Sequence, residues 1–172
     1  MLFHSIEVQY ICAIFVKTVT AKKETTNNES SIDQTQAVVE VGGGLPRLMV
    51  DAFWLRQAVN NLVSNALKFT RDGEPPRLTI RAYAHEPAIE PDAQSVADAR
   101  PMRGLVFEDQ GPGVEENQRE RIFGLFHRGV SRDVPGTGAG LAIVAQVAER
   151  YGGRVWVEDA PGGGARFILA FY

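Results

Sequence analysis

The segment Gly136-Thr137-Gly138-Ala139-Gly140-Leu141-Ala142-Ile143-Val144 places three alternating glycines directly before an apolar, helix-forming run. Glycine lets a backbone approach a ligand closely, because no Cβ stands in the way. The first turn of the following helix offers unpaired N–H groups and the positive end of the helix dipole. Together these features form a cradle for an anion, most naturally phosphate. A flexible loop before an ordinary helix explains the segment equally well, so the rest of a nucleotide site has to be found elsewhere in the chain.

Length and composition describe one ordinary domain. The chain has 172 residues, 44% of them hydrophobic, which is enough to bury a core. Its 18 basic and 21 acidic residues give no electrostatic footprint for nucleic acid. A single cysteine, Cys12, excludes an intramolecular disulfide and is typical of a reducing compartment. The apolar run at 10–16 is too short to span a bilayer, and no secretory signal is apparent. We expect a cytoplasmic domain with no direct membrane insertion.

Strand-like and helix-like patterns alternate along the chain, as in an α/β domain. Strands are expected at 3–9, 37–41, 78–84, 105–108, 154–157 and 165–171. Helices are expected at 10–24, from the N-cap Asp51 onward, and from the glycine segment to Tyr151. The polar segment 25–36 predicts a loop. The segment 85–103 is rich in Pro, Ala and acids, and predicts a mobile hairpin insertion between two strands.

Two carboxamides and an ammonium group share one face of the helix that Asp51 opens. Asn61, Asn65 and Lys68 stand at positions i, i+4 and i+7, beside an apolar stripe. Asparagine is a poor choice for a helix interior, and a solvated face more usually holds Glu and Lys. Carboxamide oxygens can ligate a hard cation such as Mg²⁺, and lysine suits phosphate. A solvated helix face without function is the alternative, and on these residues alone it is favoured.

A carboxylate and two spaced glycines follow the strand at 105–108. Asp109 can only accept hydrogen bonds when ionised, so it suits an exocyclic amine such as that of adenine. Gly111 and Gly113 would let the backbone turn under a flat base. The alternative is a plain turn with an acid that caps a helix, because Glu115 and Glu116 resemble a helix start.

Two aromatic residues flank a glycine in Arg121-Ile122-Phe123-Gly124-Leu125-Phe126-His127-Arg128-Gly129. We interpret Phe123 and Phe126 as the hinge that anchors a short lid over 130–135. Arg128 and Arg132 would then lie near enough to meet phosphate.

The chain contains four motifs in this order: RQAVNNLVSNALKFT, EDQGPGV, RIFGLFHRG and GTGAGLAIV. They resemble the N, G1, F and G2 boxes of the catalytic ATP-binding (HATPase_c) domain of sensor histidine kinases. That domain belongs to the GHKL superfamily, which also includes gyrase, Hsp90 and MutL. The resemblance covers residues 51–153, the last hairpin agrees with it, and residues 1–50 fit loosely. It implies a single domain over 1–172 with the Bergerat ATP-binding fold, a two-layer α/β sandwich whose mixed sheet has helices on one face. The short lid is similar to that of phytochrome-type kinases.

The resemblance also implies roles for individual residues. Asn65 would hold Mg²⁺ with Asn61 assisting, and Asn65 and Lys68 would serve catalysis, with Lys68 on phosphate. Asp109 would receive the adenine amine. The other nucleotide contacts that it implies are Phe69, Gly111, Gly113, Phe126, Arg128, Arg132, Gly136, Thr137, Gly138, Gly140 and Leu141. Family members often carry Asn at the position of Gln110. They often carry a threonine that supports the adenine pocket in the last strand, at the position of Arg166.

Asn61 favours one reaction within the superfamily. The ATPases are expected to carry Glu there, because water needs a general base and a carboxamide cannot take a proton. Histidine, with a reference pKa of about 6.5, presents a free nitrogen lone pair at neutral pH. Asn61 therefore favours a histidine protein kinase over an ATPase. A degenerate nucleotide-binding regulatory module is the other alternative.

The acceptor histidine is expected on another domain. In the family it lies in a dimerisation helical hairpin, within a His-acid-apolar-basic-x-Pro motif. His4, His85 and His127 lack such surroundings. The expected partners are therefore an acceptor-histidine dimerisation domain of the parent protein and, through it, a response regulator. Without that domain the chain is expected to be inactive.

Overall fold

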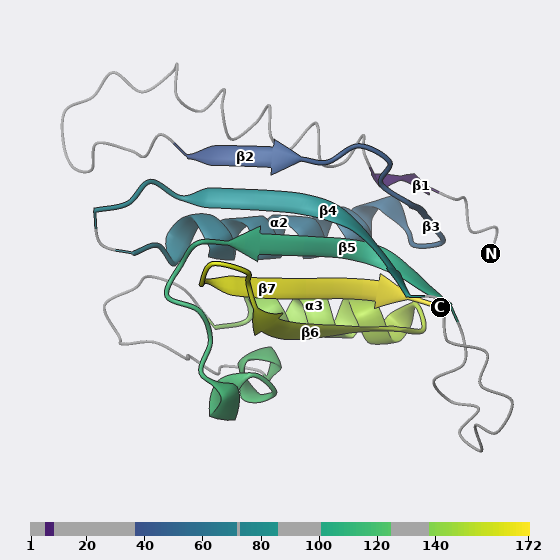
Figure 1. The fold of residues 1–172 in the computed structure, drawn as a ribbon. Coiled ribbons are helices and arrows are strands. Elements are labelled where there is room, and N and C mark those ends of the chain that lie inside the picture. Colours follow the sequence, from purple (N-terminus) through teal and green to yellow (C-terminus); the bar gives the residue numbers. More distant parts are fainter. Residues whose placement is uncertain (1–5, 9–36, 72, 86–100, 125–137) are drawn as a thin grey trace, which may run out of the picture.

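A five-stranded mixed sheet forms one layer of the domain. The computed structural model describes residues 6–8, 37–71, 73–85, 101–124 and 138–172. The strands are β2 (Val38–Val41), β4 (Arg77–His85), β5 (Met102–Asp109), β6 (Gly153–Asp159) and β7 (Ala165–Phe171). Their order across the sheet is β2-β4-β5-β7-β6 (Figure 1). β2 runs parallel to β4, and the other neighbours are antiparallel. The expected mixed sheet is confirmed.

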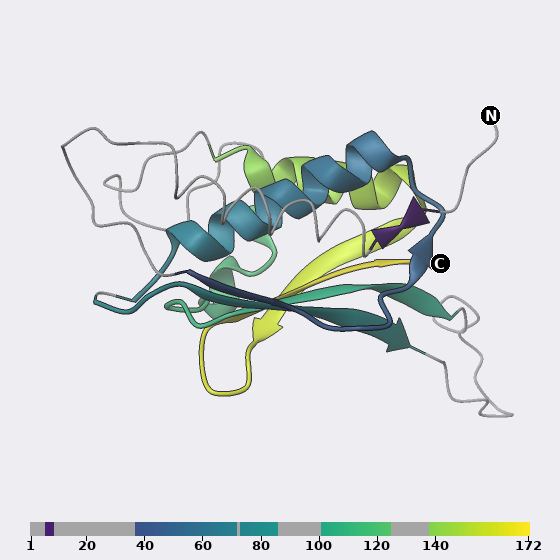
Figure 2. The same cartoon turned by 90° about the horizontal axis from the view of Figure 1, so that it is seen from above.

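Two helices lie side by side over one face of this sheet and form the second layer (Figure 2). They are α2 (Ala52–Lys68) and α3 (Gly140–Arg150). Asp51 caps α2, because its Oδ1 accepts the N–H of Phe53 at 2.9 Å. The core fills the space between the layers, and its members include Leu55, Leu62, Val144, Leu78, Ile80, Leu105, Phe107, Phe167 and Leu169. The predicted helix cap and the two-layer sandwich are both confirmed. No helix in the described part is long and apolar enough to cross a bilayer.

The edges of the domain contain the differences from expectation. A second sheet pairs β1 (Ile6–Glu7) with β3 (Arg47–Leu48). The sequence did not predict β3, because a strand of two residues is too short to show an alternating pattern. The helix start expected at Glu115-Glu116 is a single 3₁₀ turn, η2 (Glu116–Gln118), followed by η3 (Arg121–Phe123). The helix at 10–24 and the loop at 25–36 lie outside the described residues.

The strands around the predicted insertion are longer than the sequence indicated. Their antiparallel register continues to the pair His85 and Met102, so both ends of the segment 85–103 belong to β4 and β5. Cross-strand pairing overrides the weak local pattern at these ends. Residues 86–100 lie outside the described part, and their expected mobility stays a prediction.

The sheet face turned away from the helices carries its own side-chain network. Arg81 and Glu108 approach to 2.8 Å across β4 and β5, and Arg166 of β7 lies 3.3 Å from the same Glu108 carboxylate. Farther along the sheet, the rings of Tyr83 and Trp156 pack edge to face with their centroids 5.4 Å apart, beside buried Val106 and Ile168.

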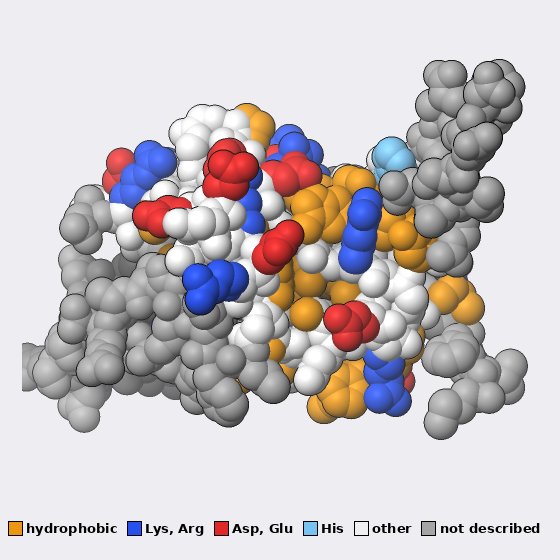
Figure 3. Space-filling model, turned by 90° about the horizontal axis from the view of Figure 1, so that it is seen from below, with side chains coloured by type: hydrophobic (Ala, Val, Ile, Leu, Met, Phe, Trp, Pro, Cys, Tyr) orange, Lys and Arg blue, Asp and Glu red, His pale blue; other side chains and the backbone are white. Residues whose placement is uncertain are grey.

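Seen from the β6 side, acidic and basic side chains are interspersed around apolar surface, with no single-sign patch (Figure 3). The described part therefore shows no basic patch on the face in this view.

Glu108→Gln should lower the free energy of unfolding by about 1–2 kcal/mol, because a largely buried carboxylate would lose its charge beside two arginines. Urea unfolding of the variant measures the loss. Glu116→Gln, at an exposed acid of η2, is the control and should change stability little. Equal stability of the Glu108 variant and the parent would contradict the importance of this network.

Candidate nucleotide-binding site

Asp109 ends β5 as a buried acid held by backbone donors. Only 8% of the Asp109 surface is exposed to solvent. The N–H groups of Gly111 and Ala165 donate to Asp109 Oδ1 at 2.9 and 3.0 Å. Both of these hydrogen bonds end on the same oxygen, and none from another described residue ends on Oδ2. The carboxylate is thus fixed in orientation and keeps acceptor capacity for a ligand.

The environment of Asp109 acts on its pKa in two directions. Burial raises the pKa, because removal from water disfavours the charged form. The N–H groups of Ala165 and Gly111 lower it, because they stabilise the carboxylate. The effect of burial is the larger, so the pKa of Asp109 lies above its ordinary value. Perturbed acids of this kind are common in binding sites.

The turn after Asp109 lies directly against the end of α2. A Cβ added to Gly111 would overlap the carbonyl oxygen of Phe69 and lie 3.0 Å from Asp109 Oδ1. Only glycine permits this approach. The N–H of Phe69 in turn bonds to the carbonyl of Asn65, one helical turn earlier, at 2.9 Å. The acid and the polar end of the asparagine helix therefore lie at the same end of the molecule.

The start of α3 lies against the middle of α2. A Cβ added to Gly140 would lie 3.2 Å from Asn61 Oδ1, so a larger residue would push the two helices apart. Asn61 Nδ2 is buried and has no hydrogen-bond partner among the described residues. Buried amide groups are usually paired with protein or with water, so this donor needs a partner that the described residues do not supply. Two segments about 80 residues apart in the sequence thus meet at one carboxamide.

Other predicted residues lie at the end of α2, in the turn after Asp109 and around the start of α3. Lys68 places its ammonium 5.0 Å from the centre of the Phe69 ring. Gly113 and Gly138 have positive φ angles of 82° and 72°. Leu141 is half-buried and packs against the hydrophobic core. Phe126, Arg128, Arg132, Gly136 and Thr137, with the predicted lid, lie outside the described residues. The nucleotide roles of all these residues stay predictions.

The position that supports the acid is Ala165, not Arg166. Arg166 lies on the opposite face of the sheet, where it pairs with Glu108 and Glu158. Neighbouring strand residues point to opposite faces, so the Arg166 side chain does not face the expected adenine pocket. Ala165 donates its backbone N–H to Asp109 and its side chain lies in the core. An alanine that acts through its backbone leaves no signal in the sequence.

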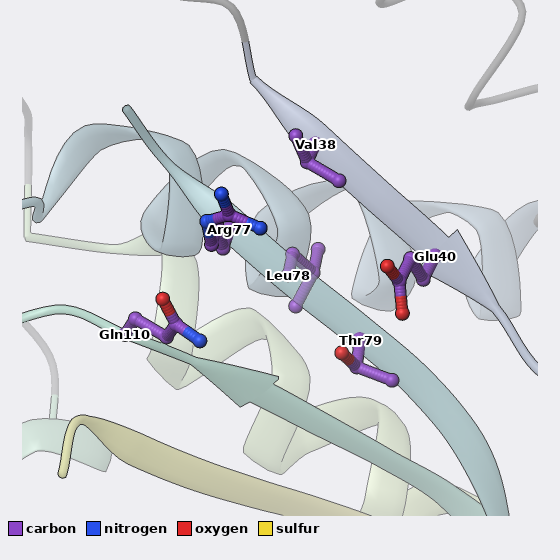
Figure 4. A pocket seen from close by; sticks show the side chains of 6 residues that line it. All are labelled: Val38, Glu40, Arg77, Leu78, Thr79 and Gln110. Carbon is purple, nitrogen blue, oxygen red and sulfur yellow. The ribbon is translucent and has the colours of Figure 1, made fainter. Parts of the chain in front are cut away.

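A shallow hollow on the outer side of the sheet does not belong to this site. It has a volume of about 80 Å³ and is lined by Val38, Glu40, Arg77, Leu78, Thr79 and Gln110 (Figure 4). Ligand pockets for molecules of nucleotide size are several times larger. Gln110 lines this hollow and is exposed, whereas the neighbouring Asp109 is buried.

The family follows from this geometry and from comparison with known proteins. Residues 50–172 match the family described as histidine kinase-, DNA gyrase B- and HSP90-like ATPase. The chain belongs to this family. Within the histidine kinase-, gyrase- and HSP90-like ATPases it corresponds to the ATP-binding catalytic domain of sensor histidine kinases.

Two curated relatives and one solved structure show how this ATPase-family domain compares with known proteins. The chain is 34% identical over 149 residues to phytochrome-like protein Cph1 of Synechocystis, covering 86% of this chain and 18% of that protein. It is 40% identical over 117 residues to sensor histidine kinase AruS of Pseudomonas aeruginosa, covering 66% of this chain and 10% of that protein. The solved structure of the mycobacterial sensor histidine kinase MprB superposes with a TM-score of 0.66 at 25% identity, covering 98% and 95% of the two chains. The chain thus spans a small part of its curated relatives, and the phytochrome-type subfamily stays a prediction.

Proposed function

We infer that this chain binds Mg²⁺-ATP between the end of α2, the Asp109 turn and the start of α3, and presents the γ-phosphate to a histidine on a separate helical hairpin. The observation that carries the inference is the contact of Gly111 with both Phe69 and Asp109. It joins a purine-recognising acid to the helix that holds Asn61, Asn65 and Lys68. Family membership supplies nucleotide binding.

The base end of the site would be read by Asp109. Its Oδ2 would accept the exocyclic amine of adenine, while Oδ1 stays bound to the two backbone N–H groups. Guanine carries a carbonyl oxygen where adenine carries that amine, so an acceptor facing it would repel guanine nucleotides. Recognition through a fixed buried acceptor gives selectivity, because the wrong base leaves the acceptor unpaired.

The phosphate end would be formed by α2 and α3. Asn65 and Asn61 offer carboxamide oxygens, and Mg²⁺ is usually held by one or two protein ligands together with substrate phosphates. The described residues contain no cluster of three or more His, Cys, Asp or Glu, and this arrangement does not require one. When bound, the ion would neutralise phosphate charge. Lys68 would add positive charge, and Gly138 and Gly140 would bring the backbone close to the phosphates.

Transfer to histidine fits Asn61 better than hydrolysis does. A carboxamide at this position cannot deprotonate water, whereas a neutral imidazole already has a free lone pair. The proposed partners are therefore the acceptor hairpin and, through it, a response regulator. Phosphorylation of a supplied acceptor hairpin in trans would separate this function from that of a binding module without kinase activity. Release of free phosphate without an acceptor would favour an ATPase.

Asn65→Ala should remove the magnesium dependence of nucleotide binding, because the proposed metal ligand is lost. Calorimetric titration with a non-hydrolysable ATP analogue, with and without Mg²⁺, measures the effect. In the parent chain Mg²⁺ should tighten binding at least about tenfold, and in the variant this gain should fall to about twofold or less. Ser64→Ala, at an exposed neighbour on α2, is the matched control. An unchanged magnesium effect in the Asn65 variant would refute the site assignment.

A further inference from the structure

Arg71 lies where three separate segments of the chain meet. It follows the end of α2 by three residues, and its Nε donates to the carbonyl oxygen of Gly111 at 3.2 Å. A Cβ added to Gly163 would lie 2.5 Å from Arg71 Nη2, so the guanidinium packs directly over this glycine of the β6–β7 turn. One side chain therefore bridges the α2 end, the Asp109 turn and the β6–β7 turn.

These contacts continue to the buried acid. Gly111, whose carbonyl Arg71 holds, donates its own N–H to Asp109 Oδ1. The β6–β7 turn leads into Ala165, which is the second donor to that oxygen. Arg71 thus holds both segments that orient Asp109, and among the described residues its hydrogen bond goes to the Gly111 carbonyl and not to the carboxylate itself. The planar guanidinium suits this task, because it can bond through one edge and pack through its face.

We propose that Arg71 is a positioning residue for base recognition, which fixes the Gly111 turn and the β6–β7 turn so that Asp109 is held ready for the adenine amine. The proposal rests on the proposed nucleotide site at Asp109. It assigns Arg71 no contact with phosphate or metal. A well-oriented acceptor binds more tightly than one that must first be ordered, since the ordering cost is removed from binding.

The first test uses the nucleotide-free chain. Arg71→Ala should speed amide hydrogen exchange at Gly111 and Ala165 about tenfold, because the turns that hold these N–H groups against Asp109 lose their common partner. Arg71→Lys, which keeps the charge and one possible donor, should show a smaller effect. Arg154→Ala is the matched control, since that guanidinium packs over Trp156 at 4.8 Å on the outer face of the sheet. Unchanged exchange in Arg71→Ala would overturn the proposal.

The second test measures affinity. Arg71→Ala should weaken ADP and a non-hydrolysable ATP analogue by the same factor, about tenfold, with Arg71→Lys between the variant and the parent. A loss that grows with the number of phosphates would mean that Arg71 contacts phosphate, and would overturn the proposal. Unchanged nucleotide affinity together with faster hydrogen exchange would also overturn the proposal. If the parent chain bound no nucleotide, the proposed function would fail instead, and the exchange experiment would still report on the turns.

Discussion

Asp109→Asn should lower the affinity for ATP about 100-fold, equivalent to about 3 kcal/mol, and should leave the domain folded. Asparagine keeps an oxygen that can accept the N–H groups of Gly111 and Ala165. It replaces the second carboxylate oxygen with an amide group, which would face the adenine amine donor to donor. Titration of the variant with a non-hydrolysable ATP analogue measures the loss.

Asp159→Asn is the matched control for this substitution. Asp159 is also an acid near the end of a strand, but its side chain is 74% exposed and pairs with Arg119 at 2.7 Å. Exposed ion pairs of this kind contribute little, so affinity should stay within about twofold of the parent. Wild-type affinity in the Asp109 variant would remove the acid from the site and, with it, the basis for placing adenine there.

The raised pKa of Asp109 affects nucleotide binding and folding stability in opposite directions. Binding needs the carboxylate, so affinity should fall as the pH drops through the raised pKa. Folding favours the protonated acid, because the folded chain holds this proton more tightly than the unfolded chain does. Stability from this group is therefore lost as the pH rises through the pKa of the folded state. Asp109→Asn should melt at the same temperature as the parent at neutral pH, or higher, which thermal unfolding measures.

The parts of the site that sequence predicts well are those with a strong local pattern. Asp51 as N-cap, the helical face with Asn61 and Asn65, and the glycines beside Asp109 each follow from residue type and spacing. Their ordered combination resembles a family whose fold the structure reproduces. Hydrophobic periodicity and turn chemistry are local properties, so they can be recognised without coordinates.

The parts that sequence missed depend on contacts between distant segments. Arg71 follows a helix and has the pattern of a surface charge, yet its partners lie 40 and 92 positions further along the chain. Ala165 acts through its backbone, whereas the side chain of its neighbour Arg166 lies on the opposite face of β7. Only the pairing of strands and the packing of turns bring these groups to Asp109.

Gly164→Ala should lower the free energy of unfolding by about 3 kcal/mol and weaken nucleotide binding as well. Gly164 has a positive φ of 96°, and an added Cβ would overlap the carbonyl oxygen of Asp109. The strand end that carries the acid would have to move to make room. Chemical denaturation measures the first effect, and titration with a non-hydrolysable ATP analogue measures the second.

Gly162→Ala separates the collision from the backbone strain. Gly162 lies in the same turn with a φ of 89°, but an added Cβ there would meet nothing within 4 Å. It should lower stability by about 1 kcal/mol, the usual cost of a left-handed conformation, and leave binding unchanged. The difference between the two variants then measures how tightly the β6–β7 turn is pressed against the acid. Equal losses would mean that the turn can move away from Asp109 freely, and a turn that moves freely could not help to orient the carboxylate.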